Sequence, residues 1–204
     1  MSEENSNEMI ELDVEQDVWD RTYTVYSLLI IGSKEEDGNY NFAPKHMAMP
    51  MGFSNHFGFI GTPRKSTYRN IQREKVFTVS YPKPDQLTVS SLAATQREDD
   101  DSKPVLNEIP TSPAQQIDGY FVKDSYFQLE CKLTECLGKF GEWELIVGEI
   151  VAARINKKMN RKIGDGVGEG QLIYDNPLLA YLHPNRFSVI KESNVFPFPK
   201  ELKR

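Results

Sequence analysis

Two long segments, residues 126–137 and 142–156, alternate apolar and polar side chains and are joined by Gly138-Lys139-Phe140-Gly141. On one side of the first segment lie Phe127, Leu129, Cys131 and Leu133. A period of two residues is the signature of a β-strand with one buried face. We therefore expect two long, half-buried strands of a barrel. Glu149 shares a face with Leu145, Val147 and Val151, and we expect it to pair with a base or to cap backbone groups inside the barrel.

The remaining elements are shorter, and most of them have strand composition. Strands are predicted at residues 22–31, 40–44, 53–60, 76–81 and 186–190, with a further apolar segment at 177–182. A hairpin turn is predicted at Asp37-Gly38, and short helices at 66–75 and 85–95. Many strands interrupted by a few short helices favour a mainly β, Greek-key-like barrel over a βαβ fold.

Composition and charge limit the class of protein. A chain of 204 residues can bury one full core, so residues 21–204 are expected to form a single domain. Residues 1–20 carry eight acids and no base, which predicts a partly disordered acidic arm rather than a secretion signal. The net charge of −6 disfavours nucleic acid and acidic membranes as partners, and no apolar run approaches a membrane span.

The two cysteines, Cys131 and Cys136, fit neither a redox motif nor a zinc motif. We expect them to be buried thiols in a protein of the reducing cytoplasm. The three histidines, His46, His56 and His183, are far apart in the sequence and show no metal-ligand spacing, so no metal site is predicted.

The candidate binding site is a loop that leads into the first helix. Gly61-Thr62-Pro63 is followed by Arg64-Lys65-Ser66-Thr67, which places two cations and two hydroxyls at the helix start. Free backbone N–H groups and the helix dipole favour an anion there, whereas cations alone would oppose the dipole. The pattern indicates a site for a phosphate monoester; the alternative is a basic helix start exposed to water.

The order of several motifs resembles that of the flavin reductase-like family of FMN-binding split-barrel flavoproteins, over about residues 22–190. The motifs are Asn41-Phe42-Ala43-Pro44, Lys65-Ser66-Thr67-Tyr68-Arg69-Asn70-Ile71, Leu129-Glu130-Cys131, Val147-Gly148-Glu149-Ile150 and Pro177-Leu178-Leu179. One departure is Ser80, where the family often has Asn. Each motif is weak by itself, and the ordered set is specific.

The resemblance implies a split β-barrel that dimerises and holds FMN near the subunit interface. It implies that the isoalloxazine is lined by Asn41, Phe42, Ala43 and Pro44, whose segment we interpret as a turn offering backbone donors and acceptors. The ribityl phosphate would be held by Thr62, Arg64, Lys65, Ser66 and Thr67. Asn70 would support the loop.

The family likeness also implies an oxidoreductase in which NADH or NADPH passes a hydride to the flavin N5. No catalytic side chain is identified, because the cofactor carries the chemistry. An electron carrier of the flavoredoxin type, without direct use of NAD(P)H, is the main alternative. A nucleic-acid binder is a third alternative, which the net charge disfavours.

Three further segments carry weaker expectations. The acidic and proline-rich residues 97–116 are expected to form a mobile loop or lid. The glycine-rich residues 164–170 are expected to be a flexible loop rather than a nucleotide motif. The bases at 154–162 are interpreted as a solvated loop, with attraction of a pyridine nucleotide phosphate as the alternative.

Overall fold

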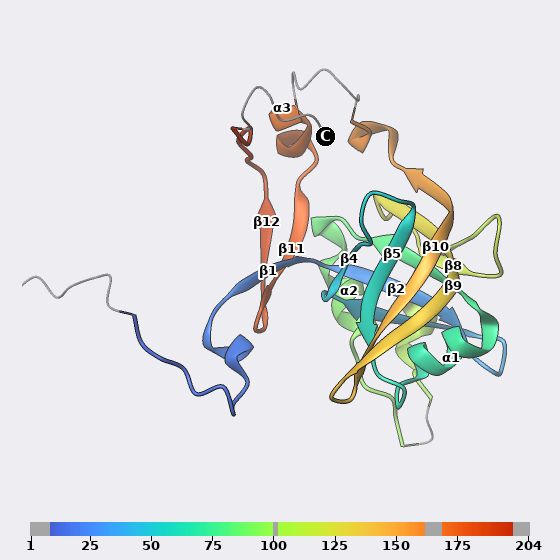
Figure 1. Cartoon of the computed structure of the whole chain (residues 1–204). Helices are drawn as coiled ribbons and strands as arrows, with labels where there is room; N and C mark the ends of the chain where they lie inside the picture. The colour runs from blue at the N-terminus through green and yellow to red at the C-terminus, as the bar shows by residue number, and fades with distance from the viewer. Residues whose placement is uncertain (1–8, 100–101, 162–168, 198–204) are drawn as a thin grey trace, which may run out of the picture.

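A computed structural model describes residues 9–99, 102–161 and 169–197, which form three antiparallel sheets and a few short helices (Figure 1). The largest sheet contains β2 (Leu29–Lys34), β3 (Tyr40–Lys45), β4 (Ala48–Pro50), β5 (His56–Gly61), β6 (Val76–Tyr81), β9 (Phe127–Phe140) and β10 (Trp143–Ile155). A second sheet contains β1 (Thr24–Ser27), β11 (Leu178–His183) and β12 (Arg186–Ile190). β7 (Thr111–Pro113) pairs with β8 (Tyr120–Val122). The helices are α1 (Ser66–Glu74), α2 (Leu87–Ala93), α3 (Glu169–Asp175) and the 3-10 turns η1 (Val18–Arg21), η2 (Pro84–Gln86), η3 (Pro104–Glu108) and η4 (Lys157–Met159).

The seven-stranded sheet has the order β3-β2-β6-β9-β10-β5-β4 and curls around one core. Its two longest strands, β9 and β10, are the segments expected from the alternating pattern, and they pair along almost their whole length. Within the described residues the sheet does not close, because β3 and β4 each have a partner strand on one side only. The prediction of a mainly β split barrel with short helices is confirmed.

Strand β2 is buried on both faces. Leu29 and Ile31 point into the barrel core with Phe59, Phe77 and other large side chains. Ile30 points the opposite way, into a second cluster with Phe42. That second cluster is covered by α2, η3 and β8. Burial of both faces explains the uninterrupted run of apolar residues from Leu28 to Ile31. A strand that contacts water on neither face does not alternate apolar and polar residues.

Several predicted boundaries were wrong. Residues 22–31 form two strands, β1 and β2, which belong to different sheets. Asn41-Phe42-Ala43-Pro44 is not a turn but the middle of β3, where Ala43 lies opposite Ile31. Phe53 lies in the loop before β5 and is fully exposed. The Asp37-Gly38 turn is confirmed, and Gly38 has the positive φ of 86° that favours glycine.

The prediction for Glu149 was also wrong, because the other face of β10 enters the core. Ile146 belongs to the core cluster, and Ile150 packs against it. β10 keeps an unbroken register with β5 from Glu144 to Glu149, and alternate residues of a strand face opposite sides of the sheet. Glu149 therefore lies on the outer face and is exposed, and the buried acid of this sheet is Glu130 on β9, with 1% of its surface accessible.

Glu130 anchors part of the segment that was expected to be a mobile lid. Its carboxylate accepts hydrogen bonds from the backbone N–H groups of Gln115 (3.0 Å), Gln116 (2.6 Å) and Ile117 (3.2 Å). Arg154 lies 3.4 Å from the same carboxylate and stacks on the Phe121 ring. The earlier part of the segment contains η3, and Ile109 is buried in the second cluster. Residues 102–117 are thus tied to the barrel.

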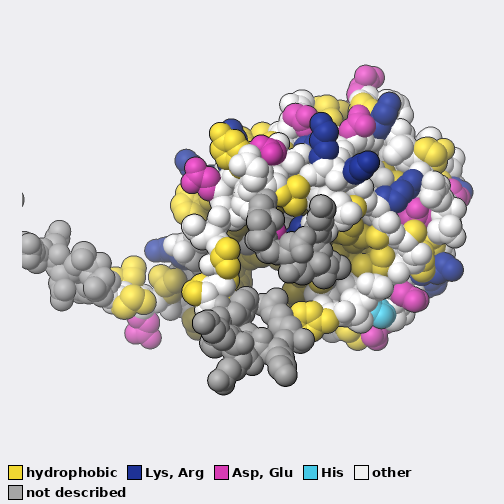
Figure 2. Space-filling model, turned by 90° about the horizontal axis from the view of Figure 1, so that it is seen from above, with side chains coloured by type: hydrophobic (Ala, Val, Ile, Leu, Met, Phe, Trp, Pro, Cys, Tyr) yellow, Lys and Arg dark blue, Asp and Glu magenta, His cyan; other side chains and the backbone are white. Residues whose placement is uncertain are grey.

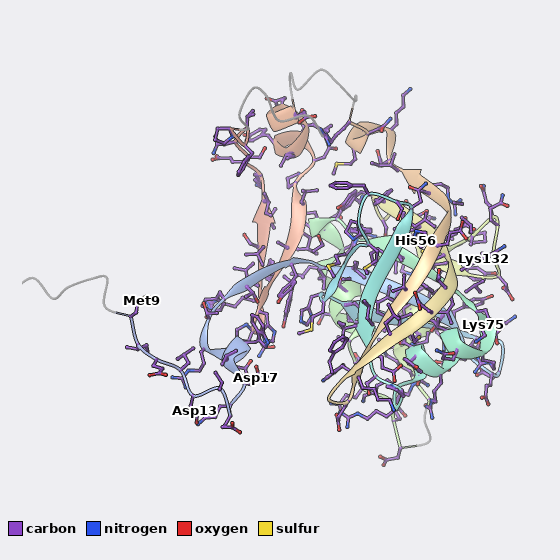
Figure 3. All side chains as sticks on the ribbon, viewed as in Figure 1. Met9, Asp13, Asp17, His56, Lys75 and Lys132 are labelled. Atoms are coloured by element: carbon purple, nitrogen blue, oxygen red, sulfur yellow. The ribbon has the colours of Figure 1, made fainter. Side chains whose placement is uncertain are left out.

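The three-stranded sheet stands to one side of the barrel (Figure 1). Residues 9–17 extend further away, and Met9, Asp13 and Asp17 lie along this segment without reaching the barrel (Figure 3). Residues 1–8, part of the expected acidic arm, lie outside the described residues, as do residues 164–168 of the expected glycine loop. None of the helices in the described parts of the chain is long and apolar enough to cross a membrane.

Replacing Glu130 by Ala should lower the free energy of unfolding by about 2–4 kcal/mol, because three part-buried backbone N–H groups and Arg154 lose their acceptor. Urea denaturation measures this change, and limited proteolysis should detect new cleavage within residues 110–119. Glu135→Ala is the matched control, since Glu135 lies on the same strand and is exposed. Equal stability of the two variants would show that Glu130 does not hold the segment.

Candidate functional site

The predicted phosphate loop connects β5 to α1. Thr62 is buried directly after β5, and its carbonyl accepts a hydrogen bond from the Lys65 backbone N–H at 3.1 Å. α1 begins at Ser66 with Lys65 as its N-cap, and no side chain in the described parts of the chain caps its first N–H groups. The first turn also contains no acid. Free N–H groups beside cations at a helix start are suited to an anionic ligand.

A buried hydrogen bond fixes this helix start to the barrel. Asn41 Nδ2 on β3 donates to Thr67 Oγ1 on α1 at 2.9 Å. One turn later, Asn70 Nδ2 donates to Ser33 Oγ on β2 at 3.2 Å. Both pairs join the β2–β3 hairpin to the face of α1 that carries Ile71 into the core. The first turn of α1 is thereby held at the edge of β3.

Between this helix start and β3 lies a cavity of about 530 Å³, which we name the α1 cavity. Its wall contains Asn41, Ala43, Lys45, Thr62, Arg64, Lys65, Ser66, Thr67, Arg69, Ala94, Thr95, Gln96, Arg97, Lys103 and Trp143. Six of these residues are bases and none is an acid. In a chain of net charge −6, such a concentration of positive charge indicates an anion site.

The six bases differ in how their charge is neutralised. Arg64 pairs with Glu142 at 2.7 Å, but both side chains are well exposed, so the pair contributes little. Arg97 pairs with Glu35 in a half-buried position. Among the described residues, no carboxylate forms an ion pair with Lys45, Lys65, Arg69 or Lys103. An anion bound beside any of these four cations would not break an existing ion pair.

Burial weakens the charge of two of these lysines. It is the main cause that lowers the pKa of Lys45, and the nearby Lys65 lowers it further. Burial, with a smaller contribution from Arg97, also lowers the pKa of Lys103 to about 8. The Lys103 ammonium donates to the carbonyl oxygens of Ala93 at 2.7 Å and Phe42 at 3.5 Å. An anion beside either lysine would stabilise its charged form.

Seven of the ten sequence-predicted residues line the α1 cavity: Asn41, Ala43, Thr62, Arg64, Lys65, Ser66 and Thr67. The other three do not. Phe42 is turned into the second core cluster, because alternate residues of β3 face opposite sides. Pro44 lines a neighbouring cavity, and Asn70 is buried behind the helix start, where it supports the hairpin.

The neighbouring cavity, of about 400 Å³, shares Lys45 and Ala94 with the α1 cavity. His46 and Tyr181 contribute to its wall, and their ring centroids lie 4.6 Å apart. His46 also stacks on His183, with ring centroids 5.5 Å apart. The histidines are therefore not all dispersed, contrary to the impression from their sequence positions. Across the described parts of the chain, no three His, Cys, Asp or Glu residues form a group that could hold a metal ion.

Sequence reasoning missed Lys45, Arg97 and Lys103 as members of the site. Lys45 directly follows the Asn41–Pro44 motif, and that position was the only available signal. Arg97 and Lys103 lie in the acidic segment that was interpreted as a lid, and only the packing of this segment brings them to β3. At the basic strand end, Arg154 contacts Glu130 and Arg161 contacts Glu169, so both have protein partners.

Comparisons with known proteins agree with this architecture. The model of the flavin reductase like domain family matches residues 22–183. Nitrilotriacetate monooxygenase component B from Bacillus cereus superposes with a TM-score of 0.78 at 16% identity, covering 94% of this chain and 100% of that chain. Flavoredoxin of Desulfovibrio vulgaris gives a TM-score of 0.72 at 17% identity, covering 94% and 99%.

An FMN-binding protein from Thermus thermophilus, solved with bound p-hydroxybenzaldehyde, gives a TM-score of 0.68 at 16% identity, covering 85% of this chain and 91% of that chain. A search of curated protein sequences finds no match. At these identities the solved structures establish the fold, and the family match over most of the chain establishes the relationship. This protein belongs to the flavin reductase-like family of split-barrel proteins.

Proposed function

We propose that the protein is an FMN-binding oxidoreductase that uses NADH or NADPH to reduce its flavin. The observation that carries the proposal is the α1 cavity, which combines an uncapped helix start, four hydroxyl side chains and six bases with no acid in its described wall. The flavin reductase-like family supports an oxidoreductase. When bound, FMN would supply a ring that accepts a hydride at N5.

The residues of the cavity fit FMN in size and chemistry. A volume of about 530 Å³ is within the range of cofactor sites. The backbone N–H groups at the start of α1, with Lys65, Ser66 and Thr67, would hold the phosphate. Thr67 Oγ1 accepts from Asn41, so its own O–H remains available to donate.

The flavin ring would lie along β3. β3 is an edge strand, so part of its backbone is not used by the sheet and can offer donors and acceptors to the pyrimidine edge. Ala43 leaves room there because its side chain is small and lines the cavity. The buried side of the strand would exclude water from one face of the ring, since Phe42 is packed into the core.

An electron carrier without direct use of NAD(P)H is the second candidate, favoured by the similarity to flavoredoxin over 94% of this chain. Two measurements separate the candidates. The absorbance spectrum of the purified protein reports whether flavin is bound, and steady-state oxidation of NADH or NADPH with added FMN reports reductase activity. Bound flavin without NAD(P)H oxidation would favour the carrier.

Replacing Lys65 or Thr67 by Ala should weaken FMN binding by about 10- to 100-fold each, the scale of a charge-assisted hydrogen bond. Riboflavin, which lacks the phosphate, should lose little affinity. Thr67→Ser keeps the hydroxyl and should retain FMN. Lys132→Ala is the control, because Lys132 is an exposed lysine on β9 that does not line the cavity (Figure 3). Equal losses for FMN and riboflavin would place the phosphate elsewhere.

Ala43→Leu should abolish binding of both FMN and riboflavin, because the larger side chain would occupy the place of the ring. The fold should persist, since the change lies on a cavity wall. Pro44→Gly should weaken binding only modestly by adding backbone freedom to the strand. Titration followed by flavin fluorescence measures all three proteins. Wild-type affinity and spectrum in Ala43→Leu would show that the ring does not contact this strand.

The protein should be a homodimer with twofold symmetry. The aromatic-rich strands β5 and β8 offer little apolar surface to a second subunit, because Phe57, Phe59, Phe121 and Val122 are buried within the chain. Exposed apolar side chains lie instead on the three-stranded sheet, at Val25 and Phe187, with Tyr23 just before β1. In the view from above, hydrophobic side chains lie along part of the rim of a central hollow (Figure 2).

Light scattering should therefore give twice the chain mass of 23.4 kDa at micromolar concentration. The double variant Val25→Asp/Phe187→Asp should give the mass of one chain. Phe53→Ser, which changes an exposed aromatic residue in the loop before β5, is the control and should stay dimeric. A monomeric wild-type protein with flavin still bound would contradict the prediction.

A further inference from the structure

A second cavity, of about 510 Å³, adjoins the α1 cavity; we name it the hairpin cavity because the turn between β2 and β3 forms one side. The two cavities share Arg97 and Lys103 in their walls. The apolar part of the hairpin cavity is formed by Tyr40, Phe42, Pro104, Leu106, Ile109 and Tyr120. Its polar part includes Glu35, Asp37, Asn39 and Asn107. The proposed function does not use this space.

The positive charges around the two cavities form two separate groups. Lys45 and Lys65 are close enough for Lys65 to lower the pKa of Lys45. Lys103 and Arg97 are likewise close, and burial together with Arg97 lowers the pKa of Lys103 to about 8, although Glu35 offsets part of this. One phosphate at the start of α1 would neutralise the first group only. The second group offers another position for an anion, at the entrance to the hairpin cavity.

The Arg97–Glu35 ion pair and the two Lys103 hydrogen bonds hold this second group in place. Lys103 donates to two carbonyl oxygens and forms no ion pair with a carboxylate of the described residues. An anionic group at this point would gain a charge-assisted hydrogen bond without breaking an ion pair of Lys103.

The wall beyond these cations has the chemistry of a ribonucleotide site. The Tyr40 and Tyr120 rings meet edge to face, with centroids 4.6 Å apart, and the Tyr40 hydroxyl donates to Asp118. These fixed rings could pack against a base, while the amide side chains of Asn39 and Asn107 could meet its polar edge.

Asp37 supplies the acceptor that a ribose requires. The backbone N–H of Asn39 and its side-chain amide donate to the Asp37 carboxylate at 2.9 and 2.8 Å. These hydrogen bonds lower the pKa of Asp37, so the carboxylate is ionised at neutral pH. A carboxylate that accepts from ribose hydroxyls is a recurrent feature of dinucleotide sites.

We propose that the hairpin cavity binds the adenosine 5′-phosphate half of a dinucleotide. The phosphate lies against Lys103 and Arg97, the ribose against Asp37, and the base against Tyr40 and Tyr120. The dinucleotide's other half then points towards the α1 cavity, which shares the two cations. The location of the adenylate rests on these residues alone, and only its link to a redox reaction rests on the proposed function.

Calorimetric titration with 5′-AMP tests the site without any dinucleotide. Wild-type protein should bind 5′-AMP both alone and with saturating FMN, and adenosine should bind about tenfold more weakly, because it lacks the phosphate. Equal affinities for 5′-AMP and adenosine, no binding at millimolar concentration, or displacement of FMN by 5′-AMP would each overturn the proposal.

Lys103→Met should bring the affinity for 5′-AMP down to that for adenosine, and Lys103→Arg should keep most of the difference. Lys123→Met is the matched control, because the Lys123 side chain lines neither cavity. This variant should bind 5′-AMP as the wild type does. If Lys103→Met prefers 5′-AMP over adenosine as strongly as the wild type does, the phosphate lies elsewhere and the proposal is overturned.

A second cycle tests the ribose contact. The Asp37→Asn variant should bind 5′-AMP more weakly than the wild type does, and the wild type should bind 2′,3′-dideoxy-AMP more weakly than 5′-AMP. The variant should bind the dideoxy ligand no more weakly than either single change predicts, because both changes remove the same contact. Fully additive losses would show that Asp37 does not contact the ribose hydroxyls and would overturn that part of the site.

Competition experiments identify the source of the adenylate. Displacement of 5′-AMP by NADH or NADPH but not by FAD assigns the site to the pyridine nucleotide, and displacement by FAD assigns it to a flavin dinucleotide. Displacement by none of these overturns the proposal. A wild-type protein that binds 5′-AMP but not FMN would refute the proposed function alone. A wild-type protein that binds FMN but not 5′-AMP would refute the hairpin cavity site alone.

Discussion

The double burial of β2 is the constraint on which the rest of the structure depends. A strand that is dry on both faces must be covered on both, and here the barrel core with α1 lies on one face and α2, η3 and β8 on the other. The neighbouring strand β3 then lies at the sheet edge between these two layers. The α1 cavity forms where β3, the start of α1 and the end of α2 meet. The binding site is thus a consequence of how the core is covered.

Two buried polar contacts convert this packing into a defined geometry. Asn41 to Thr67 fixes the start of α1 against β3, and Glu130 fixes residues 115–117 against β9. Buried polar groups are costly unless they are paired, so each contact strongly favours one arrangement over its alternatives. The second contact ties the end of the acidic, proline-rich segment to the barrel. Near the start of that segment, the Arg97–Glu35 ion pair and the hydrogen bonds of Lys103 to the Ala93 and Phe42 carbonyls hold Arg97 and Lys103 at the site.

The electrostatic organisation of the chain is uneven. An acidic protein places six bases around one cavity, and some of them lie at a helix start where cations are unfavourable. Lys45 and Lys103 additionally lose solvation on burial, which lowers the pKa of each. Such an arrangement is unfavourable without a ligand, and an anion would offset the cost. The family relationship and the charge distribution therefore support the same class of ligand, a phosphorylated cofactor.

Local patterns in the sequence were sufficient to predict the strands β6, β9 and β10, the Asp37-Gly38 turn and helix α1. These elements are predictable because alternation, turn chemistry and helix signals act over a few residues. The loop at Thr62 to Thr67 belongs to this group. Three features depended on the tertiary structure. Glu149 is exposed because the opposite face of β10 enters the core. Glu130 receives its N–H partners from the distant residues 115–117, and Lys103 reaches β3 only when its segment packs. Each depends on strand register or on contacts between residues far apart in sequence, and these arise only when the whole sheet curls around its core.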